Sequence, residues 1–323
     1  MIITKTPLRI GFVGGGTDIP AYYRNYGGAL ISAAINKYIY IIVNKKFDSK
    51  IRISYSQTEI VDRIDEIKHP SVREALRFLN IDGGIEILSI SDIPSHGTGL
   101  GSSSTFLVGL LNALHAYKSE YVTREELASE AVKIEREILR EAGGKQDQYM
   151  AAFGGINMLN FNENESVNVN PVALSIDMLE KLRSNIAFLY TGINRKSPEI
   201  HTDMEKQINE HLDAYHEMKR LTRDFYDALY RMDINSMGEI LDRNWSLKKS
   251  LSSRISNKEI DDLYAMAKSA GALGGNLIGA GGGGFLVFIV GDDKKSNVVR
   301  TLGLREMDFD FDFEGSRIIY FSK

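Results

Sequence analysis

PSHGTGLGSSS, at residues 94–104, is the segment on which the predicted fold of this chain depends. It stands directly before residues 105–117, whose apolar residues recur at helical spacing and predict a helix. The N-terminus of a helix offers unpaired backbone N–H groups, and glycine lets the backbone wrap closely around an anion. Serine hydroxyls add donors, and one of them can ligate Mg²⁺. The segment therefore predicts a phosphate-binding loop. A flexible turn is the alternative, and three alternate glycines followed by three serines disfavour it.

Composition narrows the class of protein. The chain has 323 residues, of which 43% are hydrophobic and 25% charged, as in globular proteins large enough for two domains. A net charge of -4 argues against a broad nucleic-acid-binding face. The chain has no cysteine, so disulfides and cysteine-ligated metal sites are excluded. No signal peptide and no apolar run of bilayer length is visible, so we expect a cytoplasmic protein without membrane contact.

Alternating and β-branched runs predict strands in the first half of the chain, at residues 8–13, 39–43, 51–55 and 85–90. Two further helices are predicted there, at residues 72–79 and 125–139. Thr123 is the expected N-cap of the second helix, and Glu126 three residues later completes a capping box.

The second half is richer in helical patterns. We expect it to begin near residue 180, after the weakly patterned segment 162–177. One apolar stripe with steps of three or four predicts a single long helix over residues 199–232. The other expected elements are a strand at 186–190, helices at 235–250 and 257–270, two strands around a glycine run, a short helix, and strands at 305–311 and 317–321.

Two more glycine runs stand at the ends of predicted strands. Gly14-Gly15-Gly16-Thr17-Asp18 follows a strand that contains Arg9, and a turn explains its glycines but not a buriable aspartate just past them. Residues 279–284 match G-x-G-x-x-G, but a dinucleotide site needs a helix after the glycines, and a strand pattern follows here. This run therefore predicts a tight strand–strand connection, for which a simple hairpin turn is the favoured interpretation on its own. No Walker A segment occurs, which excludes a P-loop NTPase.

Two carboxylates flank a polar connection between helices. Phosphoryl transfer to a hydroxyl needs a metal ligand and a group that orients or deprotonates the hydroxyl. Glu135 within a helix and Asp147 just beyond it have the chemistry for these two roles. The alternative is a solvated charged helix face, and without further context this alternative is favoured, because charged residues surround Glu135.

Residues 7–18, 94–104 and 279–284, in this order, resemble the three motifs of the GHMP kinase superfamily, which includes galactokinases, homoserine kinases and mevalonate kinases. The resemblance spans nearly the whole chain. It implies an α+β fold of two domains with the active site in the cleft between them. Residues 1–180 would form the N-terminal domain, like domain 2 of ribosomal protein S5, and residues 181–323 a ferredoxin-like C-terminal domain of helices and a sheet.

The resemblance also implies a role for individual residues. ATP and Mg²⁺ are the implied cofactors. The nucleotide would be bound by Gly97, Gly99, Leu100, Gly101, Ser102, Ser103 and Ser104. Ser103 and Glu135 match the metal ligands. Asp147 matches the catalytic aspartate, and Arg9 the cation beside it. The implied substrate-binding residues are Gly16, Thr17, Asp18, Gly281, Gly282, Arg195 and Lys196.

Three segments narrow the resemblance to one branch. GGGTD at 14–18, GGKQDQY at 143–149 and YTGINR at 190–195 are similar to the branch of heptose 7-phosphate kinases and fucokinases. This branch implies ATP-dependent phosphorylation of the anomeric hydroxyl of D-glycero-D-manno-heptose 7-phosphate to the 1,7-bisphosphate, in nucleotide-activated heptose synthesis. A kinase acting on C1 of L-fucose or another hexose is the first alternative. A nicotinamide-dependent oxidoreductase and a non-catalytic nucleotide-binding protein are the others. The expected partner is a small sugar or sugar phosphate, without nucleic acid or membrane, and a homo-oligomer stays open.

Overall fold

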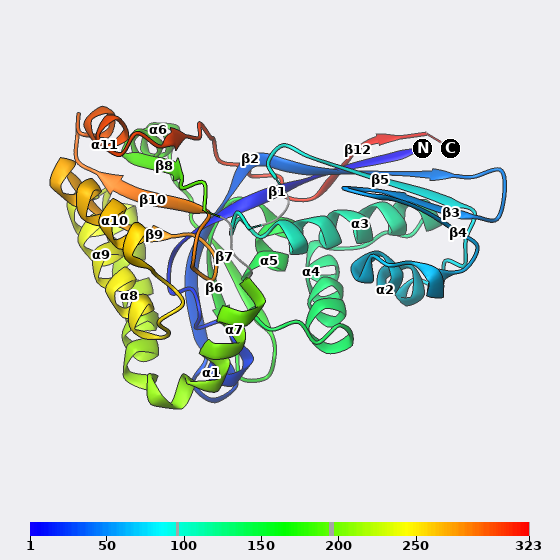
Figure 1. Ribbon diagram of the computed structural model, residues 1–323, viewed down its shortest axis with the longest axis horizontal. Helices are drawn as coiled ribbons and strands as arrows, with labels where there is room; N and C mark the ends of the chain where they lie inside the picture. The colour runs from blue at the N-terminus through cyan, green and yellow to red at the C-terminus, as the bar shows by residue number, and fades with distance from the viewer. Residues whose placement is uncertain (95–96, 194–196, 323) are drawn as a thin grey trace.

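The chain folds into two β-sheets, each packed against helices, that meet along the middle of the molecule (Figure 1). The computed structural model describes residues 1–94, 97–193 and 197–322. The first sheet has the strand order β12-β1-β2-β5-β3-β4, and β6 and β7 extend it from β2. Its strands are β1 (Ile2–Val13), β2 (Gly28–Lys45), β3 (Ile51–Ser54), β4 (Thr58–Val61), β5 (Ile85–Ser91), β6 (Ile156–Phe161), β7 (Val167–Pro171) and β12 (Arg317–Phe321).

The two longest strands extend beyond their predicted bounds. β1 starts at Ile2, although Pro7 interrupts the pattern and a proline disfavours a central strand. The pairing of β1 with β2 shifts register between Pro7 and Leu8, and this irregularity accommodates the proline. β2 is long enough to pair with β6 through its first residues and with β5 through its last.

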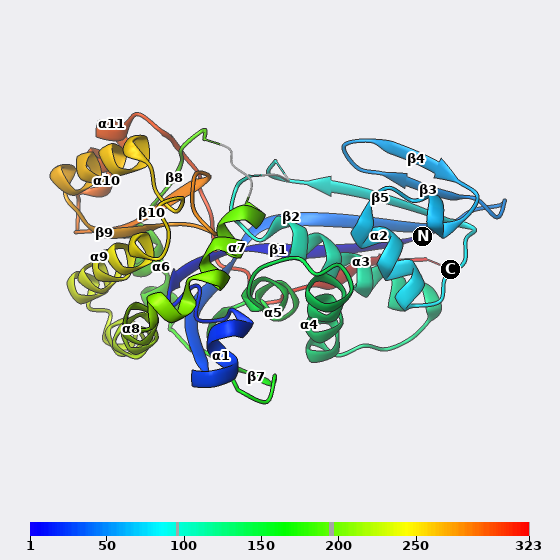
Figure 2. The same cartoon turned by 60° about the horizontal axis from the view of Figure 1, so that its bottom comes forward.

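Helices of the first half cover one face of the first sheet, as both views show (Figures 1 and 2). They are α1 (Pro20–Tyr26), α2 (Pro70–Phe78), α3 (Ser102–Lys118), α4 (Arg124–Val132) and α5 (Gln146–Phe153). A π-helical segment, Lys133–Ile138, continues α4. The capping box of Thr123 and Glu126 is confirmed, because each side chain bonds the backbone N–H of the other residue. α3 is buried along nearly its whole length against β1 and β2, which fixes the start of this helix beneath the sheet.

The second sheet has the order β11-β8-β10-β9. Its strands are β8 (Ile186–Tyr190), β9 (Ala272–Leu277), β10 (Phe285–Val290) and β11 (Arg305–Glu306). The helices of this half are α6 (Ile176–Ser184), α7 (Ser197–Lys206), α8 (Leu212–Arg231), α9 (Ile234–Ser250), α10 (Lys258–Ala270) and α11 (Lys295–Leu302). α9 and α10 pack on β9, whereas α6 and α11 pack on β8. Within the described ranges, no helix is long and apolar enough to cross a membrane.

The prediction of one helix over 199–232 is wrong. α7 ends at Lys206, a 3-10 turn follows at Ile208–Glu210, and α8 begins at Leu212. The apolar stripe continues across the break because Met204 and Ile208 are also buried, so the spacing gave no sign of it. The break directs α7 over the junction of the two sheets, where it lies in both views (Figures 1 and 2).

The predicted strand at 305–311 is also wrong in its extent. β11 covers only Arg305–Glu306, and the chain leaves the second sheet after Met307, whose N–H still donates to the carbonyl of Phe188 at 2.8 Å. Phe311 forms an isolated bridge with Ile35, so this segment crosses to the first sheet. β12 then pairs antiparallel with β1, and the two chain ends lie side by side (Figure 1). The domain boundary near residue 180 stays a prediction.

Candidate active site

The predicted phosphate loop turns directly into the N-terminus of α3. Gly97, Gly99 and Gly101 all have left-handed backbone conformations, with φ of 75°, 76° and 80°. Only glycine adopts this conformation at little cost, and alternation of left-handed residues with ordinary ones turns successive N–H groups toward one side. Gly101 is the N-cap of α3, so the unpaired amides of the first helical turn are added to this set. The loop therefore has the backbone geometry of an anion cradle, while its binding of a nucleotide stays a prediction.

The third glycine run packs against this loop. A Cβ on Gly99 would collide with the carbonyl oxygen of Ile278, and a Cβ on Gly284 would collide with that of Thr98. Such close backbone packing requires glycine at both positions. The predicted tight connection between two strands is confirmed, since β9 precedes the run and β10 follows it.

A pocket lies next to this run and is lined by residues from both halves of the chain, among them Arg9, Asp18 and Asp147. Only one end of the glycine run lines this pocket. Gly279 and Ala280 line the pocket. Gly281 lies against the backbone of Ile255, and the Gly282 N–H donates to the Ile255 carbonyl at 2.9 Å. The predicted role of Gly281 and Gly282 in substrate binding stays a prediction.

Arg9 on β1 holds Asp147 in the first turn of α5. Arg9 Nε and Nη2 each lie 2.7 Å from Asp147 Oδ1, and Arg9 Nη1 donates to the carbonyl of Gly99 at 2.5 Å. The ideal Cβ position of Gly101 is 3.2 Å from Asp147 Oδ2, so this oxygen lies directly beside the phosphate loop. Arg9 is almost fully buried, whereas the Asp147 side chain keeps 23% of its exposure. Asp147 therefore stands between the phosphate loop and the pocket, with one oxygen bound by Arg9.

Asp18 forms another wall of the pocket. Its Oδ1 accepts from the Gly16 N–H at 3.0 Å, and its Oδ2 accepts from the Gln146 N–H at 3.2 Å. Burial raises the pKa of Asp18, while these backbone hydrogen bonds act in the opposite direction. A Cβ on Gly144 would overlap the carboxylate of Asp18, so the segment 143–147 approaches Asp18 with its bare backbone.

The segment 143–147 is held in place from outside the pocket. Lys145 is buried, pairs with the carboxylate of Glu165 and lies over the ring of Tyr23, 4.6 Å from its centroid. The Gly143 N–H donates to Glu205 of α7 at 3.1 Å. These contacts fix the backbone that positions Asp147.

The remaining predicted substrate residues divide into two groups. Thr17 Oγ1 lies 2.8 Å from the carbonyls of both Gly14 and Ala29, so its hydroxyl is directed into the fold. Its role in sugar binding stays a prediction. Arg195 and Lys196 lie outside the described residues.

Glu135 lies in the π-helical segment, where it faces the start of α3. Ser104 Oγ donates to Glu135 Oε2 at 2.8 Å, Ser103 Oγ lies 3.4 Å from Oε1, and Gln148 also donates to Oε2. Among the residues that the structure describes, the nearest cation is Arg136, whose Nη2 is 3.8 Å from Oε2. Burial raises the pKa of Glu135, so the carboxylate lacks full compensation of its charge. A carboxylate and a hydroxyl are hard oxygen ligands, and the exposed Ser103 and the buried Glu135 fit a Mg²⁺ ion.

Three further residues line the pocket and are not among the predicted site residues. Lys248 of α9 is buried, and its Nζ donates to the carbonyls of Leu277 at 3.0 Å and Gly279 at 2.7 Å. His201 of α7 and Asn276 of β9 each have one buried side-chain atom, Nδ1 and Oδ1 respectively, without a hydrogen-bond partner. None of the three residues belongs to a recognisable motif. Lys248 is followed by a second lysine on an amphipathic helix, so the sequence pattern predicts that its side chain is exposed to solvent.

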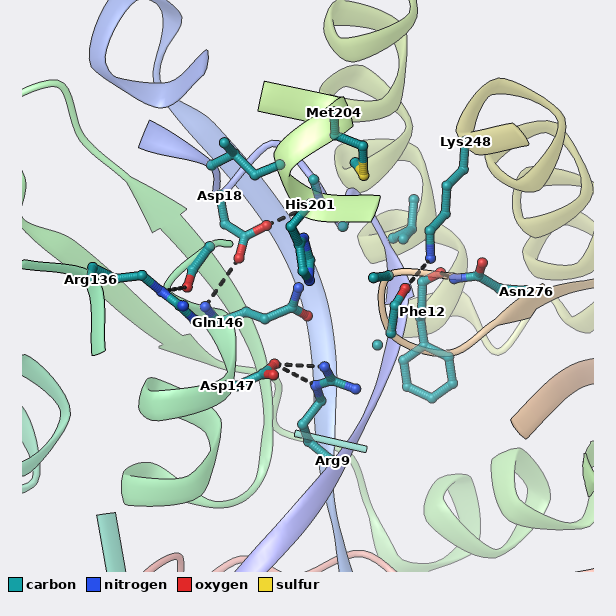
Figure 3. Close-up of a pocket in the computed structure, with 18 residues that line it drawn as sticks. Arg9, Phe12, Asp18, Arg136, Gln146, Asp147, His201, Met204, Lys248 and Asn276 are labelled. Atoms are coloured by element: carbon teal, nitrogen blue, oxygen red, sulfur yellow. Dashed lines mark hydrogen bonds and ion pairs between the residues drawn. The ribbon is translucent and has the colours of Figure 1, made fainter. Parts of the chain in front are cut away.

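The pocket gathers these groups from both halves of the chain (Figure 3). Asp147 and Arg9 lie on one side of it, and Lys248 and Asn276 on the opposite side. His201 extends between them from α7, and Asp18 lies on a third side. Burial, and next the charge of Arg136, lower the pKa of His201 to about 4, so its ring is neutral near pH 7. The partly exposed carboxylate of Asp147 beside an anion cradle, and the buried carboxylate of Asp18 on another side of the same polar pocket, are suited to transfer of a phosphoryl group to a polyhydroxyl compound.

Comparison with known proteins places the chain in a family. Residues 67–155 match the model of the GHMP kinases N terminal domain, and residues 225–306 match that of the GHMP kinases C terminal. The chain therefore belongs to the GHMP kinase family, and the α+β fold expected from the three motifs is confirmed.

Its similar proteins include sugar kinases. The chain is 34% identical to D-glycero-alpha-D-manno-heptose 7-phosphate kinase of Campylobacter jejuni, over 97% of each chain. It is 26% identical to L-fucokinase/L-fucose-1-P guanylyltransferase of Bacteroides fragilis, over 92% of this chain and 35% of that one. The crystal structure of a D-glycero-D-manno-heptose 1-phosphate kinase from Bacteroides thetaiotaomicron superposes with a TM-score of 0.83 and 28% identity, and the match covers 100% of both chains.

Proposed function

We propose that this protein transfers the γ-phosphoryl group of ATP to the anomeric hydroxyl of D-glycero-D-manno-heptose 7-phosphate and forms the 1,7-bisphosphate. The observation that carries the proposal is the position of Asp147. Its carboxylate lies beside the phosphate loop at Gly101 and lines the same pocket as Asp18. A sugar hydroxyl beside Asp147 would therefore stand between its base and a phosphoryl group on the loop.

Three residues have separate roles in the proposed reaction. Asp18 accepts hydrogen bonds from neighbouring sugar hydroxyls and so orients the ring with its anomeric oxygen toward Asp147. Asp147 takes the proton of that oxygen while the new O–P bond forms and the bond to the ADP oxygen breaks. Arg9 fixes the Asp147 carboxylate through Oδ1 and leaves Oδ2 on the side of the phosphate loop.

Ser103 and Glu135 are the residues that would hold Mg²⁺. The ion, when bound, neutralises charge on the phosphate oxygens of ATP. The buried Glu135 carboxylate, whose nearest cation is 3.8 Å away, supplies the negative charge for this cation. Ser104 and Gln148 fix the orientation of that carboxylate by hydrogen bonds to its Oε2.

A second hollow beside the phosphate loop is the proposed position of the adenine base. Pro94, the residue at which the loop begins, lines this hollow together with Tyr190, Phe285 and Met307. The rings of Tyr190 and Phe285 lie 5.0 Å apart at an angle of 42° and give the hollow an aromatic wall, as binding sites for planar ligands often have. Met307→Trp would fill the hollow. It should raise the KM for ATP and leave the KM for the sugar unchanged, and an unchanged KM for ATP would refute this position.

Both the similar proteins and the residues of the pocket support heptose 7-phosphate as the substrate. The Campylobacter relative is named for heptose 7-phosphate and matches this chain over nearly its full length, whereas the fucokinase relative is less similar. The pocket is also lined by Lys248, which has no carboxylate partner among the described residues, whereas Arg9 in the same lining is paired with Asp147. A kinase acting on C1 of L-fucose or another hexose is the alternative. The non-catalytic reading is disfavoured, because Asp147 and Glu135 are both in place.

A screen of ADP release over sugars and sugar 7-phosphates tests the function, and phosphorus NMR identifies the product. We expect a new anomeric phosphate signal beside the original 7-phosphate signal. Equal or better kcat/KM on free fucose or galactose would overturn the heptose assignment. An absence of ADP release with every sugar and sugar phosphate would overturn the kinase activity itself.

A further inference from the structure

Lys248 is a buried lysine that has no acidic partner in the described part of the chain. Its side chain comes from α9 and ends at the pocket, and the residue is only 5% exposed. Two carbonyls of the β9–β10 connection, those of Leu277 and Gly279, accept from Nζ. Among the described residues, no carboxylate lies within ion-pair distance of Nζ. A buried charge in this condition costs several kcal/mol unless an opposite charge compensates it.

The position of Lys248 in the free protein is therefore unfavourable for its charge. Burial and the nearby charge of Arg9 lower the pKa of Lys248 to about 7, and the more distant Asp18 only partly opposes them. An ammonium has three N–H donors, of which the two carbonyls take two. The third donor and the uncompensated charge are together suited to an anionic ligand.

Two other side chains of this pocket, those of Asn276 and His201, each have a buried polar atom without a hydrogen-bond partner among the described residues. Asn276 Nδ2 donates to the Phe12 carbonyl at 3.3 Å, which fixes the amide and leaves its buried Oδ1 without a partner. His201 Nδ1 is likewise buried and unpaired. Unpaired buried polar atoms are uncommon in folded proteins, and two of them in the same pocket as the remaining donor of Lys248 indicate a polar ligand at this end.

The length of the pocket identifies which part of the substrate reaches this end. Its floor follows β1 from Arg9, which holds Asp147, to Phe12, whose carbonyl holds Asn276. Three residues of extended strand span about 10 Å. This distance is comparable to that between the anomeric oxygen and the far end of a seven-carbon sugar. Figure 3 shows Lys248 and Asp147 on opposite sides of the pocket accordingly.

We propose that Lys248 binds the phosphate group that the sugar substrate already carries, and that this contact makes the enzyme prefer sugar phosphates to neutral sugars. The inference rests on the proposed function and adds to it the residue that determines this specificity. A neutral sugar would leave the buried ammonium uncompensated, and a site built for a charged group rejects an analogue that lacks it. Arg136 is less suited to the same task, since its Nε and Nη1 bond backbone carbonyls and its Nη2 lies 3.8 Å from the carboxylate of Glu135.

The test compares one sugar with and without its remote phosphate. Lys248→Met keeps the length of the side chain and removes its charge, while Lys248→Arg keeps the charge. Lys249→Met is the matched control, because Lys249 is the next residue of α9 and pairs with Asp261 outside the pocket. Thermal unfolding checks that each variant is folded.

For Lys248→Met, we expect the KM for the sugar phosphate to rise about tenfold to a hundredfold. A change of this size is usual when a hydrogen bond to a charged group is lost. The kcat/KM for the neutral sugar and the KM for ATP should stay near the wild-type values. Lys248→Arg should retain part of the preference for the sugar phosphate over the neutral sugar, and Lys249→Met should retain all of this preference. Equal losses on both sugars would overturn the proposal. A fall in kcat at unchanged KM would also overturn it, because this result would place Lys248 at the phosphoryl group of ATP.

The pH dependence of kcat/KM shows whether Lys248 acts through its charge or only through the shape of its side chain. In the free enzyme the ammonium of Lys248 loses its proton as the pH rises through about 7, so the kcat/KM for the sugar phosphate should fall above this pH. The charged or titratable groups that face it are Arg9 of β1, Asp18 after β1 and His201 of α7. Lys248→Arg should abolish this fall, since a guanidinium stays protonated.

Failure of the proposed function gives a different result. If the wild-type protein phosphorylates no sugar, binding of heptose 7-phosphate and of inorganic phosphate by calorimetry decides the role of Lys248. Binding to the wild-type protein that Lys248→Met abolishes and Lys249→Met retains supports the anion site. Equal binding to both variants, or no binding to the wild-type protein, overturns it.

Discussion

At the scale of single residues, the carboxylate of Asp147 is the group whose replacement separates chemistry from binding. Asp147→Asn preserves the shape of the side chain and removes its charge and basicity. We expect kcat to fall about 10²-fold to 10⁴-fold, the usual effect of losing a general base, while the affinity for ATP changes little. Single-turnover kinetics and nucleotide titrations measure the two quantities.

The same substitution at an exposed aspartate provides the control. Asp177→Asn in the first turn of α6 makes an identical chemical change far from the pocket, and it should leave turnover unchanged. If Asp147→Asn instead abolishes ATP binding and keeps turnover at saturation, Asp147 is a binding residue.

Ser103 tests the predicted metal site. Its hydroxyl is exposed at the start of α3 and lies 3.4 Å from Glu135, whereas the hydroxyl of Ser104 is buried and bonded. Ser103→Ala leaves the backbone cradle intact, so we expect a fall in turnover of about tenfold or more and a higher Mg²⁺ concentration for half-maximal activity. Titration of activity with Mg²⁺ measures both, with Ser269→Ala on the surface of α10 as the control. Wild-type turnover and Mg²⁺ dependence in Ser103→Ala would contradict the assignment of Ser103 as a metal ligand.

The sequence was informative for residues that belong to motifs and uninformative for the others. Asp147 and Asp18 stand beside glycines that mark their segments, whereas Glu135 was indicated only by the family resemblance. The structure brings all three to the pocket or the phosphate loop. Lys248 has no such mark. Its neighbour Lys249 has the same chemistry and is partly exposed, and only the packing of α9 on β9 distinguishes the two.

At the scale of elements, local geometry was predictable and long-range placement was not. The phosphate loop and the connection between β9 and β10 depend on glycines and on adjacent segments, so the sequence predicts their shape. The break between α7 and α8 depends on contacts with distant segments. Glu205 of α7 accepts from the Gly143 N–H, and Asp203 pairs with Arg254 at 3.0 Å. These contacts hold α7 over the pocket, and nothing in the apolar stripe of 199–232 indicates them.

Gly144 tests how closely the segment before α5 must approach Asp18. A Cβ at this position would overlap the Asp18 carboxylate, so Gly144→Ala must displace Asp18, the backbone, or both. We expect the kcat/KM for the sugar to fall on the order of 10²-fold, because small displacements of positioning groups have effects of this size. The affinity for ATP should be unchanged, and isothermal titration with a nucleotide analogue verifies this.

Gly291→Ala is the matched control for this prediction. A Cβ at Gly291 meets only the flexible side chain of Lys294, at 3.8 Å, and the residue lies beyond β10, away from the pocket. Its kinetics and melting temperature should match those of the wild type. Unchanged sugar kinetics in Gly144→Ala would show that Asp18 does not orient the substrate.

At the scale of the whole molecule, the order of three motifs identified the family and hence the fold, but not the way in which the two halves share the larger of two hydrophobic clusters. Phe12 of β1 stacks on Phe225 of α8 with ring centroids 5.6 Å apart. Both residues belong to a single hydrophobic cluster that also contains Phe309 and Phe311. Periodicity indicates that such residues are buried and cannot indicate which partners bury them.

This shared core predicts how fragments of the chain behave. A fragment of residues 1–180 lacks β12, the strand that pairs with β1, and it lacks the side chain of Phe225 that covers Phe12. It would therefore expose both the edge of the first sheet and part of its apolar core to water. We expect the full chain to unfold in one calorimetric transition and the fragment to show no cooperative transition.

A shorter truncation separates the contribution of the strand from that of the core. A chain that ends at Ser316 keeps the shared core and loses only β12, which contributes four register pairs with β1. It should remain cooperative with a lowered melting temperature, because the core is intact while the edge of β1 is exposed. Differential scanning calorimetry of the three chains gives the comparison. Two resolved transitions in the full chain, or a cooperative transition in the fragment of residues 1–180, would instead show that the residues before 180 fold independently.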